Sequence, residues 1–459
     1  MRFGQQTGNS GAKARAYLAW LSLLAVVMLS AACGADPASE QRATDTPAPT
    51  VTSLVIGQAT AAPTPTPENN VITLSVWWPE TLAPVGRGDV ATLLDAQIAA
   101  FAESQGEAVE IEFRRKRAQD VGGILLALRS ASAVAPDARP DVTLLRRSDL
   151  LSAAQEDLIA PVEGVAAAAV ISQLYDVALG LGQIDDELYG LAYMMDVLHL
   201  IYRVPETTED DDDALSQDRP RLGWSFEDVL GRGDPFVFPA QRSSGINSTF
   251  LLQYMVAGGS SPSSTGEMSI DVQALRTVLE FYEEALEDGV ISDTVLNYSA
   301  PGNYQVDLET GIITSAVVRS DLYLSLLSSG ESWLAAPVPT TSGEMATFAN
   351  AWMWVIVTDD PVRRELAIDF INWMMDADRQ SELAPLVYML PAREDALQTV
   401  DSTMDMQTMH ALLTNAQVAL PENAGGATAR AMQTALQNVL TGVRTAQEAT
   451  QDVLNQVGN

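Results

Sequence analysis

The sequence predicts an α/β fold made of alternating strands and helices. Runs rich in β-formers occur at 72–77, 109–113 and 140–145. The stretch 89–104 lies between the first two and places Val90, Leu94 and Phe101 on one helical face. Alternation of this kind favours a largely parallel sheet covered by helices.

The same criteria extend the pattern along the chain. They predict helices at 122–132, 148–158, 248–256, 271–288, 361–376 and 428–440, and strands at 313–319 and 353–357. The alternation breaks at 189–205, where an apolar run precedes an acidic block. We find no internal repeat.

Length and charge narrow the possible functions. The chain has 459 residues, of which 47% are hydrophobic, so we expect more than one folding unit. The 60 acidic residues against 26 basic ones give a formal net charge of -34. A surface this acidic repels nucleic acid, so we expect no nucleic-acid partner. It is typical of a solvated secreted protein, although an acidic cavity for cationic ligands would also account for part of it.

Cysteine and histidine are too scarce for several common kinds of site. Cys33 is the single cysteine, which excludes an internal disulfide, and His199 and His410 are the two histidines. We therefore expect no metal site and no cofactor. His199 lies within an apolar run and is expected to be a core histidine.

The first 32 residues are typical of a secretory signal peptide. Arg2, Lys13 and Arg15 precede an apolar run at 17–32 that ends in small residues, and Cys33 follows directly. This arrangement resembles a bacterial lipobox, although Leu29 lies four positions before the cysteine rather than three. The resemblance implies that Cys33 is acylated and anchors the mature protein to a membrane, outside the cytoplasm. The alternative is a plain cleaved signal with an incidental cysteine.

Two segments have the composition of mobile chain. Residues 33–70 are rich in Thr, Pro and Ala, which predicts an extended tether rather than a packed domain. Residues 206–219 contain five consecutive acidic residues at 209–213 and are expected to form a solvated loop.

Eight segments in a fixed order resemble one family. They are the opening strand at 72–77, the segments 141–145 and 158–162, 186–193 with 200–203, 224–228, 311–317 with Tyr323, 367–374, Leu-Pro-Ala-Arg at 390–393, and 439–442 with 448–449. In this order they resemble the extracellular solute-binding proteins of ABC importers, in the large family that includes maltose-binding protein. The chain departs from the family pattern at Ala192 and Arg203, where proline and asparagine are usual.

The resemblance implies a two-lobed periplasmic-binding-protein-like fold of type II with the ligand cleft between the lobes. Its implied crossings lie near residues 191, 325 and 385. We accordingly expect an N-terminal lobe of 71–190 plus 326–384 and a C-terminal lobe of 191–325 plus 385–459. It also implies a monomer that delivers its solute to the transmembrane subunits of an ABC permease.

The candidate ligand contacts have side chains suited to sugars, whose apolar ring faces and hydroxyls call for aromatic, carboxylate, amide and arginine groups. Adjacent strand residues face opposite sides, so one of Trp77 and Trp78 should face the cleft. Several candidates follow from the resemblance position by position. The full set is Trp77, Trp78, Glu80, Arg147, Asp149, Tyr193, Asp196, Asn247, Ser320, Tyr323, Trp352, Tyr388 and Arg430. Core packing of the tryptophans, and helix capping by Ser148 or Asp196, are the alternatives.

Three other functions stay open at this point. The same fold could bind a polyamine, a peptide or another small solute, and the acidity suits a polyamine. A sensory or adhesive lipoprotein without a permease is also possible. A secreted glycoside hydrolase needs only two carboxylates across a cleft. The sequence has no G-x-S-x-G, P-loop or H-E-x-x-H motif, and we expect no enzyme.

Overall fold

The computed structural model describes residues 71–457 apart from 107, 120, 163, 165, 204–222, 264–266, 401–403 and 421–423. The expected signal peptide, Cys33, the tether at 33–70 and the acidic block lie outside the described residues. In the described part, one sheet is formed by β1 Ile72–Pro79, β2 Val109–Lys116, β3 Val142–Arg146, β6 Leu191–Tyr202, β7 Ser315–Arg319, β8 Leu334–Ala336, β9 Thr347–Ile356, β10 Leu390–Pro391 and β11 Ala416–Val418. A separate hairpin pairs β4 Gln183–Ile184 with β5 Glu187–Leu188.

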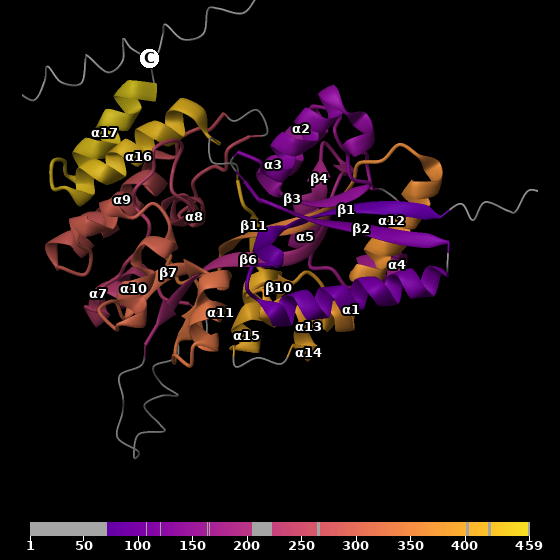
Figure 1. Cartoon of the computed structure of the whole chain (residues 1–459). Helices are drawn as coiled ribbons and strands as arrows, with labels where there is room; N and C mark the ends of the chain where they lie inside the picture. The colour runs from indigo at the N-terminus through magenta and orange to yellow at the C-terminus, as the bar shows by residue number, and fades with distance from the viewer. Residues whose placement is uncertain are drawn as a thin grey trace, which may run out of the picture. The chain divides into compact units, whose positions relative to one another are not determined.

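Helices follow most of the strands (Figure 1). They are α1 Gly88–Gln105, α2 Ile124–Val134, α3 Arg147–Gln155, α4 Ala168–Ile171, α5 Asp176–Gly182, α7 Phe226–Arg232, α8 Ser248–Val256, α9 Val272–Glu287, α10 Gln305–Glu309, α11 Ser320–Ser328, α12 Pro361–Met374, α13 Ala377–Leu386, α14 Glu394–Thr399, α15 Met406–Thr414, α16 Gly426–Leu440 and α17 Ala446–Val457. Every helix and strand predicted from the sequence is present, with ends displaced by a few residues.

Local chemistry explains where several helices begin. The Asn247 side chain accepts a hydrogen bond from the Phe250 amide and thereby caps α8. Asp360 caps α12 in the same way, with Pro361 as the first helical residue. The expected helix at 122–132 begins two residues late because Gly122 has a φ of +86°, which is incompatible with helix.

The sheet is mixed, which corrects the expectation of a largely parallel one. Parallel pairing joins β1 to β2, β1 to β3, and β11 to β9. The long strands β6 and β9 pair antiparallel with each other, and β9 also pairs antiparallel with β3. The reason is that β9 enters the sheet against the direction of β1 and β3. Strand–helix alternation in the first part of the sequence carries no information about that direction.

Two hydrophobic cores lie along the sheet. In the first, the rings of Trp78, Tyr193 and Trp354 pack with centroids 5.4–6.1 Å apart, while α1 and α12 pack against β2 and β1 (Figure 1). In the second, α9, α16 and α17 pack together, and Phe226 stacks on Phe281 at 4.0 Å. Burial of each such side chain contributes roughly 1.5–3 kcal/mol.

Strand β6 belongs to both cores, and all twelve of its residues are buried. Its first half pairs with β9 and β10, and its second half pairs with β7 and β8. The side chains of Leu390 and Leu412 lie in the first core, where the expected boundaries would have assigned them to the other lobe. They do so because β10 pairs with the first half of β6. The lobe boundaries themselves stay a prediction.

Candidate functional site

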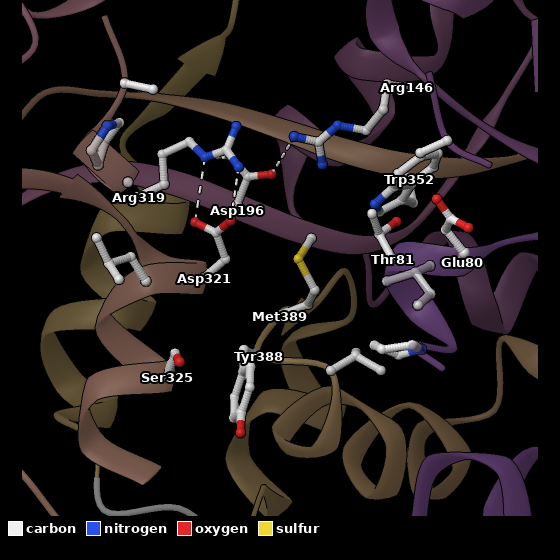
Figure 2. A pocket seen from close by; sticks show the side chains of 18 of the residues that line it. Glu80, Thr81, Arg146, Asp196, Arg319, Asp321, Ser325, Trp352, Tyr388 and Met389 are labelled. Carbon is white, nitrogen blue, oxygen red and sulfur yellow. Dashed lines mark hydrogen bonds and ion pairs between the residues drawn. The ribbon is translucent and has the colours of Figure 1, made fainter. Parts of the chain in front are cut away.

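A cavity of about 890 Å³ lies where β6 changes partners (Figure 2). This volume is within the range typical of small-molecule sites. Polar and aromatic lining residues come from the segments after β1 and β2, the ends of β3 and β7, the strands β6 and β9, the helices α10 and α11, and the turn after α13. They include Glu80, Thr81, Gln119, Arg146, Asp196, Gln305, Arg319, Asp321, Ser325, Trp352 and Tyr388.

The partner change of β6 brings the charged residues together. Val197 pairs with Ala349 of β9, and the next residue, Leu198, pairs with Arg319 of β7. Asp196 therefore lies beside the end of β7. Arg146, the last residue of β3, pairs across the sheet with Trp352 and reaches the same point. Three strands thus deliver two arginines and a carboxylate to the floor of the cavity.

These side chains form an alternating ionic chain, which we call the charge quartet: Arg146, Asp196, Arg319 and Asp321. Arg146 Nη2 lies 2.7 Å from Asp196 Oδ2, and Arg319 Nε lies 3.6 Å from Asp196 Oδ1. Arg319 Nη2 also donates to Asp321 Oδ2 at 2.7 Å. Figure 2 shows Arg146 and Arg319 approaching Asp196 from opposite sides.

Burial is strongest at the Arg146–Asp196 end of the charge quartet. The Asp196 side chain is 4% exposed and that of Arg146 is 10% exposed. The pairing of Asp196 Oδ2 with Arg146 is ionic rather than directional, because no donor is aligned on that oxygen for a hydrogen bond. Because Oδ2 is itself buried, Asp196 acts in the cavity mainly through the negative charge that it presents to the two arginines.

Arg319 and Asp321, the more exposed members of the charge quartet, have shifted pKa values. The negative charge of Asp196 raises the pKa of Arg319 above its usual range, with Asp321 adding to the effect. Burial of Asp321 opposes its ionisation, but the charge and hydrogen bonds of Arg319 outweigh this and lower the pKa of Asp321. Both groups are therefore charged at neutral pH.

Two aromatic side chains border the cavity. Arg146 lies over the ring of Trp352, 5.4 Å from its centroid. Tyr388 has a φ of +56°, a region that aromatic residues seldom occupy, and Arg87 Nη1 donates to its hydroxyl at 3.1 Å. Strained backbone of this kind concentrates at functional sites.

Of the thirteen predicted contacts, the structure brings Glu80, Asp196, Trp352 and Tyr388 together in this cavity. The other nine do not line it. Trp78 and Tyr193 are fully buried in the first core, and Trp77 is 3% exposed with Lys116 Nζ 4.1 Å from its ring centroid. Which of the thirteen contacts a solute stays a prediction.

The remaining candidates occupy structural positions. Asn247 caps α8 and donates to Gln433, and Arg430 is exposed on α16. Tyr323 is 1% exposed and packs edge-on against His199. Arg147, Asp149 and Ser320 lie at the starts of α3 and α11. Arg147 and Ser320 are one position from residues that line the cavity, and Asp149 is three positions from Arg146.

Sequence reasoning missed three members of the charge quartet, namely Arg146, Arg319 and Asp321. It selected their neighbours Arg147 and Ser320. Arg147 and Ser320 are the first residues of α3 and α11 and do not line the cavity, so an error of one position exchanges a cavity residue for a structural one. A partial signal is the end of each predicted strand, since strand ends place side chains at the edge of the sheet. Arg319 is the last residue of the strand predicted at 313–319, and Arg146 directly follows the strand predicted at 140–145.

His199 is a core residue, as expected from its apolar surroundings. It is fully buried, its Nδ1 lies 3.0 Å from the Leu200 carbonyl oxygen, and burial lowers its pKa to about 4. Among the described residues, no group of three or more histidine, cysteine or acidic side chains is arranged to hold a metal ion.

A family model described as bacterial extracellular solute-binding protein matches residues 96–410, more than half of the chain. The chain belongs to this family. The resemblance predicted from the ordered segments is thereby confirmed. Members of the family bind solutes without transforming them, so the protein is a binding protein and not an enzyme. None of the curated proteins is recognisably similar to this solute-binding chain.

Solved structures resemble the fold of this solute-binding protein at low sequence identity. One is a cyclic alpha-maltosyl-1,6-maltose binding protein from Arthrobacter globiformis, with a TM-score of 0.64, 17% identity, and coverage of 84% of this chain and 98% of that one. Another is the sugar-binding protein MalE from Xanthomonas citri, with a TM-score of 0.64, 16% identity, and coverage of 84% and 96%. A third is the GacH receptor of Streptomyces glaucescens, with a TM-score of 0.58, 14% identity, and coverage of 83% and 96%. The predicted two-lobed α/β fold is therefore confirmed.

Membership of an extracellular family indicates a location outside the cytoplasm. Within the described ranges, no helix has the length and apolar character needed to cross a membrane.

Proposed function

We propose that this protein captures a sugar or oligosaccharide in the cavity at β6 and delivers it to the transmembrane subunits of an ABC importer. The observation that carries this proposal is the lining of the cavity. Trp352 and Tyr388 lie at the same cavity as the charge quartet. Aromatic faces suit the apolar side of a sugar ring, and charged donors and acceptors suit its hydroxyls.

Similar structures support the choice of ligand. The A. globiformis protein is described as binding a cyclic maltose derivative, and GacH was solved in complex with acarbose. Both descriptions concern those proteins, at identities where similarity establishes fold alone. For this chain the argument therefore rests on its own cavity.

The rival ligand is a polyamine, which the net charge of -34 would attract. Glu80, Asp196 and Asp321 line the cavity, but each has an arginine within 4 Å. A polyamine needs carboxylates that are free to pair with its ammonium groups. The pairing within the cavity therefore favours the sugar.

Calorimetry and thermal shift on a panel of oligosaccharides, spermidine and tripeptides test the ligand. A solute that binds the folded state raises the melting temperature by mass action. Trp352→Ala and Tyr388→Ala should each weaken sugar binding by about 5-fold or more, since stacking of this type contributes about 1–3 kcal/mol. Binding of spermidine alone would overturn the carbohydrate assignment.

Trp373 provides a matched control for Trp352. It also lies under an arginine, with Arg379 at 3.5 Å from its ring centroid, and it does not line the cavity. Trp373→Ala should lower stability and leave sugar affinity unchanged in the folded fraction. Equal affinity losses in the two variants would argue against Trp352 as a ligand contact.

We also propose that the protein is a monomer and that Cys33 is acylated and tethers it to the membrane through residues 33–70. Cys33 is the sole cysteine and follows an apolar run. Cys33→Ser should release the protein in soluble form, and fractionation of the variant with membranes would contradict the anchor. Loss of sugar uptake in cells lacking the gene would support delivery to a permease.

A further inference from the structure

The charge quartet contains equal numbers of positive and negative groups and joins both halves of the sheet. Arg146 comes from the end of β3, and Arg319 comes from the end of β7. Both arginines approach the carboxylate of Asp196, one at each oxygen, and Asp321 completes the chain at Arg319. The fifth ionisable lining residue, Glu80, lies 3.8 Å from Arg117.

Burial makes this balance energetically important. A charge removed from water is tolerated when a partner compensates it and is costly when it is left alone. Asp196 and Arg146 are almost fully buried, so a solute that brings a net charge to them would leave one charge without compensation. Hydroxyl groups avoid this cost because they donate and accept without changing the charge of the site.

The remaining hydrogen-bonding capacity also suits a neutral solute. Each guanidinium has five N–H groups of which the quartet uses a part, and the side chains of Arg319 and Asp321 are 45% and 35% exposed. The cavity therefore offers acceptors and donors in alternation.

We propose that the charge quartet is the specificity element of the cavity and selects sugars without net charge over acidic sugars, amino sugars and polyamines. This inference rests on the proposed carbohydrate function and adds the charge class of the solute and the residues that set it. A purely structural ion chain predicts something different: its loss would lower stability and affect all ligands alike.

The experiment must separate the effect of the protein's net charge on binding from the effect of the charge quartet. The overall charge of -34 attracts cations over long range, and salt screens that attraction. Buried pairs are screened much less. At 0.5 M NaCl the Debye length is only about 4 Å. Measurements at this salt concentration therefore report on the cavity itself.

The test measures affinities for maltotriose, trigalacturonate, the deacetylated chitosan trimer and spermidine by calorimetry at this salt concentration. The wild type should bind maltotriose at least tenfold more tightly than the three charged probes. Asp321→Asn leaves an excess positive charge in the cavity. It should change the ratio of the affinities for maltotriose and trigalacturonate at least tenfold in favour of trigalacturonate. Arg319→Gln leaves an excess negative charge and should change the corresponding ratio in favour of the chitosan trimer.

Two control variants isolate the effect of charge. Asp321→Glu preserves the charge and should preserve the selectivity. Glu284→Gln removes an exposed acid on α9, outside the cavity lining, and should also preserve it. Melting temperatures of the ligand-free variants identify any variant that fails to fold. If Arg319→Gln fails to fold, Asp321→Glu and Asp321→Asn still form a matched pair that differs in charge at one position.

Each outcome distinguishes this inference from the proposed function. Equal binding of neutral and charged sugars by the wild type, or parallel losses for all sugars in the variants, would overturn the inference and leave the carbohydrate function intact. Binding of spermidine without any sugar would overturn both. The absence of binding by every probe would also count against both.

Discussion

The tetrapeptide Arg-Ser-Asp-Leu occurs twice, at 147–150 and at 319–322, each time where a buried strand gives way to a helix. In the first copy, helix α3 begins at Arg147. In the second copy, Arg319 is still the last residue of β7, and α11 begins one residue later at Ser320. A shift of one residue in the helix start therefore separates two identical sequences.

This shift gives the two arginines different surroundings. Arg147 Nη1 donates to the carbonyl oxygens of Leu181 and Gln183 at 2.7 and 2.6 Å, and burial lowers its pKa. Arg319 extends into the cavity, where Asp196 raises its pKa. The first holds the chain in place, and the second is available to a solute.

The two aspartates have opposite pKa shifts. Burial raises the pKa of Asp149, and Arg129 and Arg146 offset this in part. The pKa of Asp321 is lowered because its arginine neighbour outweighs its burial. The comparison teaches that identical residues acquire a role from the register of the strand end rather than from their order in the chain.

The largest expected difference between the two copies is in ligand binding. Arg319→Ala should weaken sugar binding by about 10- to 150-fold, because charged hydrogen bonds contribute about 1.5–3 kcal/mol. Arg147→Ala should lower the free energy of unfolding and leave affinity unchanged. Calorimetry and thermal melts on both variants check this, and a comparable affinity loss in Arg147→Ala would remove the distinction.

The two serines should differ in stability by a smaller amount. Ser320 is fully buried, and its Oγ accepts a hydrogen bond from the Val197 amide at 3.1 Å. Ser320→Ala leaves that buried donor unsatisfied and should destabilise the protein by about 1–3 kcal/mol. Ser148 is exposed, so Ser148→Ala should change stability by no more than about 0.5 kcal/mol. Chemical denaturation measures both, and equal values would contradict the difference in register.

The smallest expected effect is the pH dependence of the two aspartates. A lowered pKa makes Asp321 stabilising at neutral pH, and this contribution is lost as the pH falls below 3.8 and through the folded-state pKa. Asp321→Asn should therefore destabilise the ligand-free protein at pH 7 by about 1 kcal/mol or less, since the pair is partly exposed.

Asp149 should behave in the opposite sense. Its raised pKa gives a contribution that is fully present below pH 3.8 and is lost as the pH rises through the folded-state pKa. Asp149→Asn should consequently match or exceed the wild-type melting temperature at pH 7, with the advantage disappearing in acid. Melting curves between pH 3 and 7 check both signs. A fall in stability at pH 7 for Asp149→Asn would show that its arginine neighbours dominate over burial.

The sequence predicted much of the fold and little of the site. The helix at 248–256 was predicted with its observed bounds because helical spacing is a local feature, whereas its cap, Asn247, was predicted as a ligand contact. The direction of β9 was not predicted, because strand pairing depends on where the chain returns from and not on the residues of the strand. Trp352 and Trp354 share a face of β9 and both belong to the first core, yet Trp352 also lines the cavity and Trp354 does not. Depth along the strand, which no pattern records, decides between them.

The sequence by itself determined the order of strands and helices, the family, and the aromatic and acidic side chains available for binding. It did so because periodicity, capping and the order of segments are properties of the chain. The tertiary structure decided which side chains meet at the cavity. Arg146, Asp196 and Arg319 come from three different strands, and they meet because β6 changes partner from β9 to β7 at Val197 and Leu198. Arg146 and Arg319 are the last residues of their strands and line the cavity, whereas Arg147 and Ser320 already belong to the following helices and lie outside its lining.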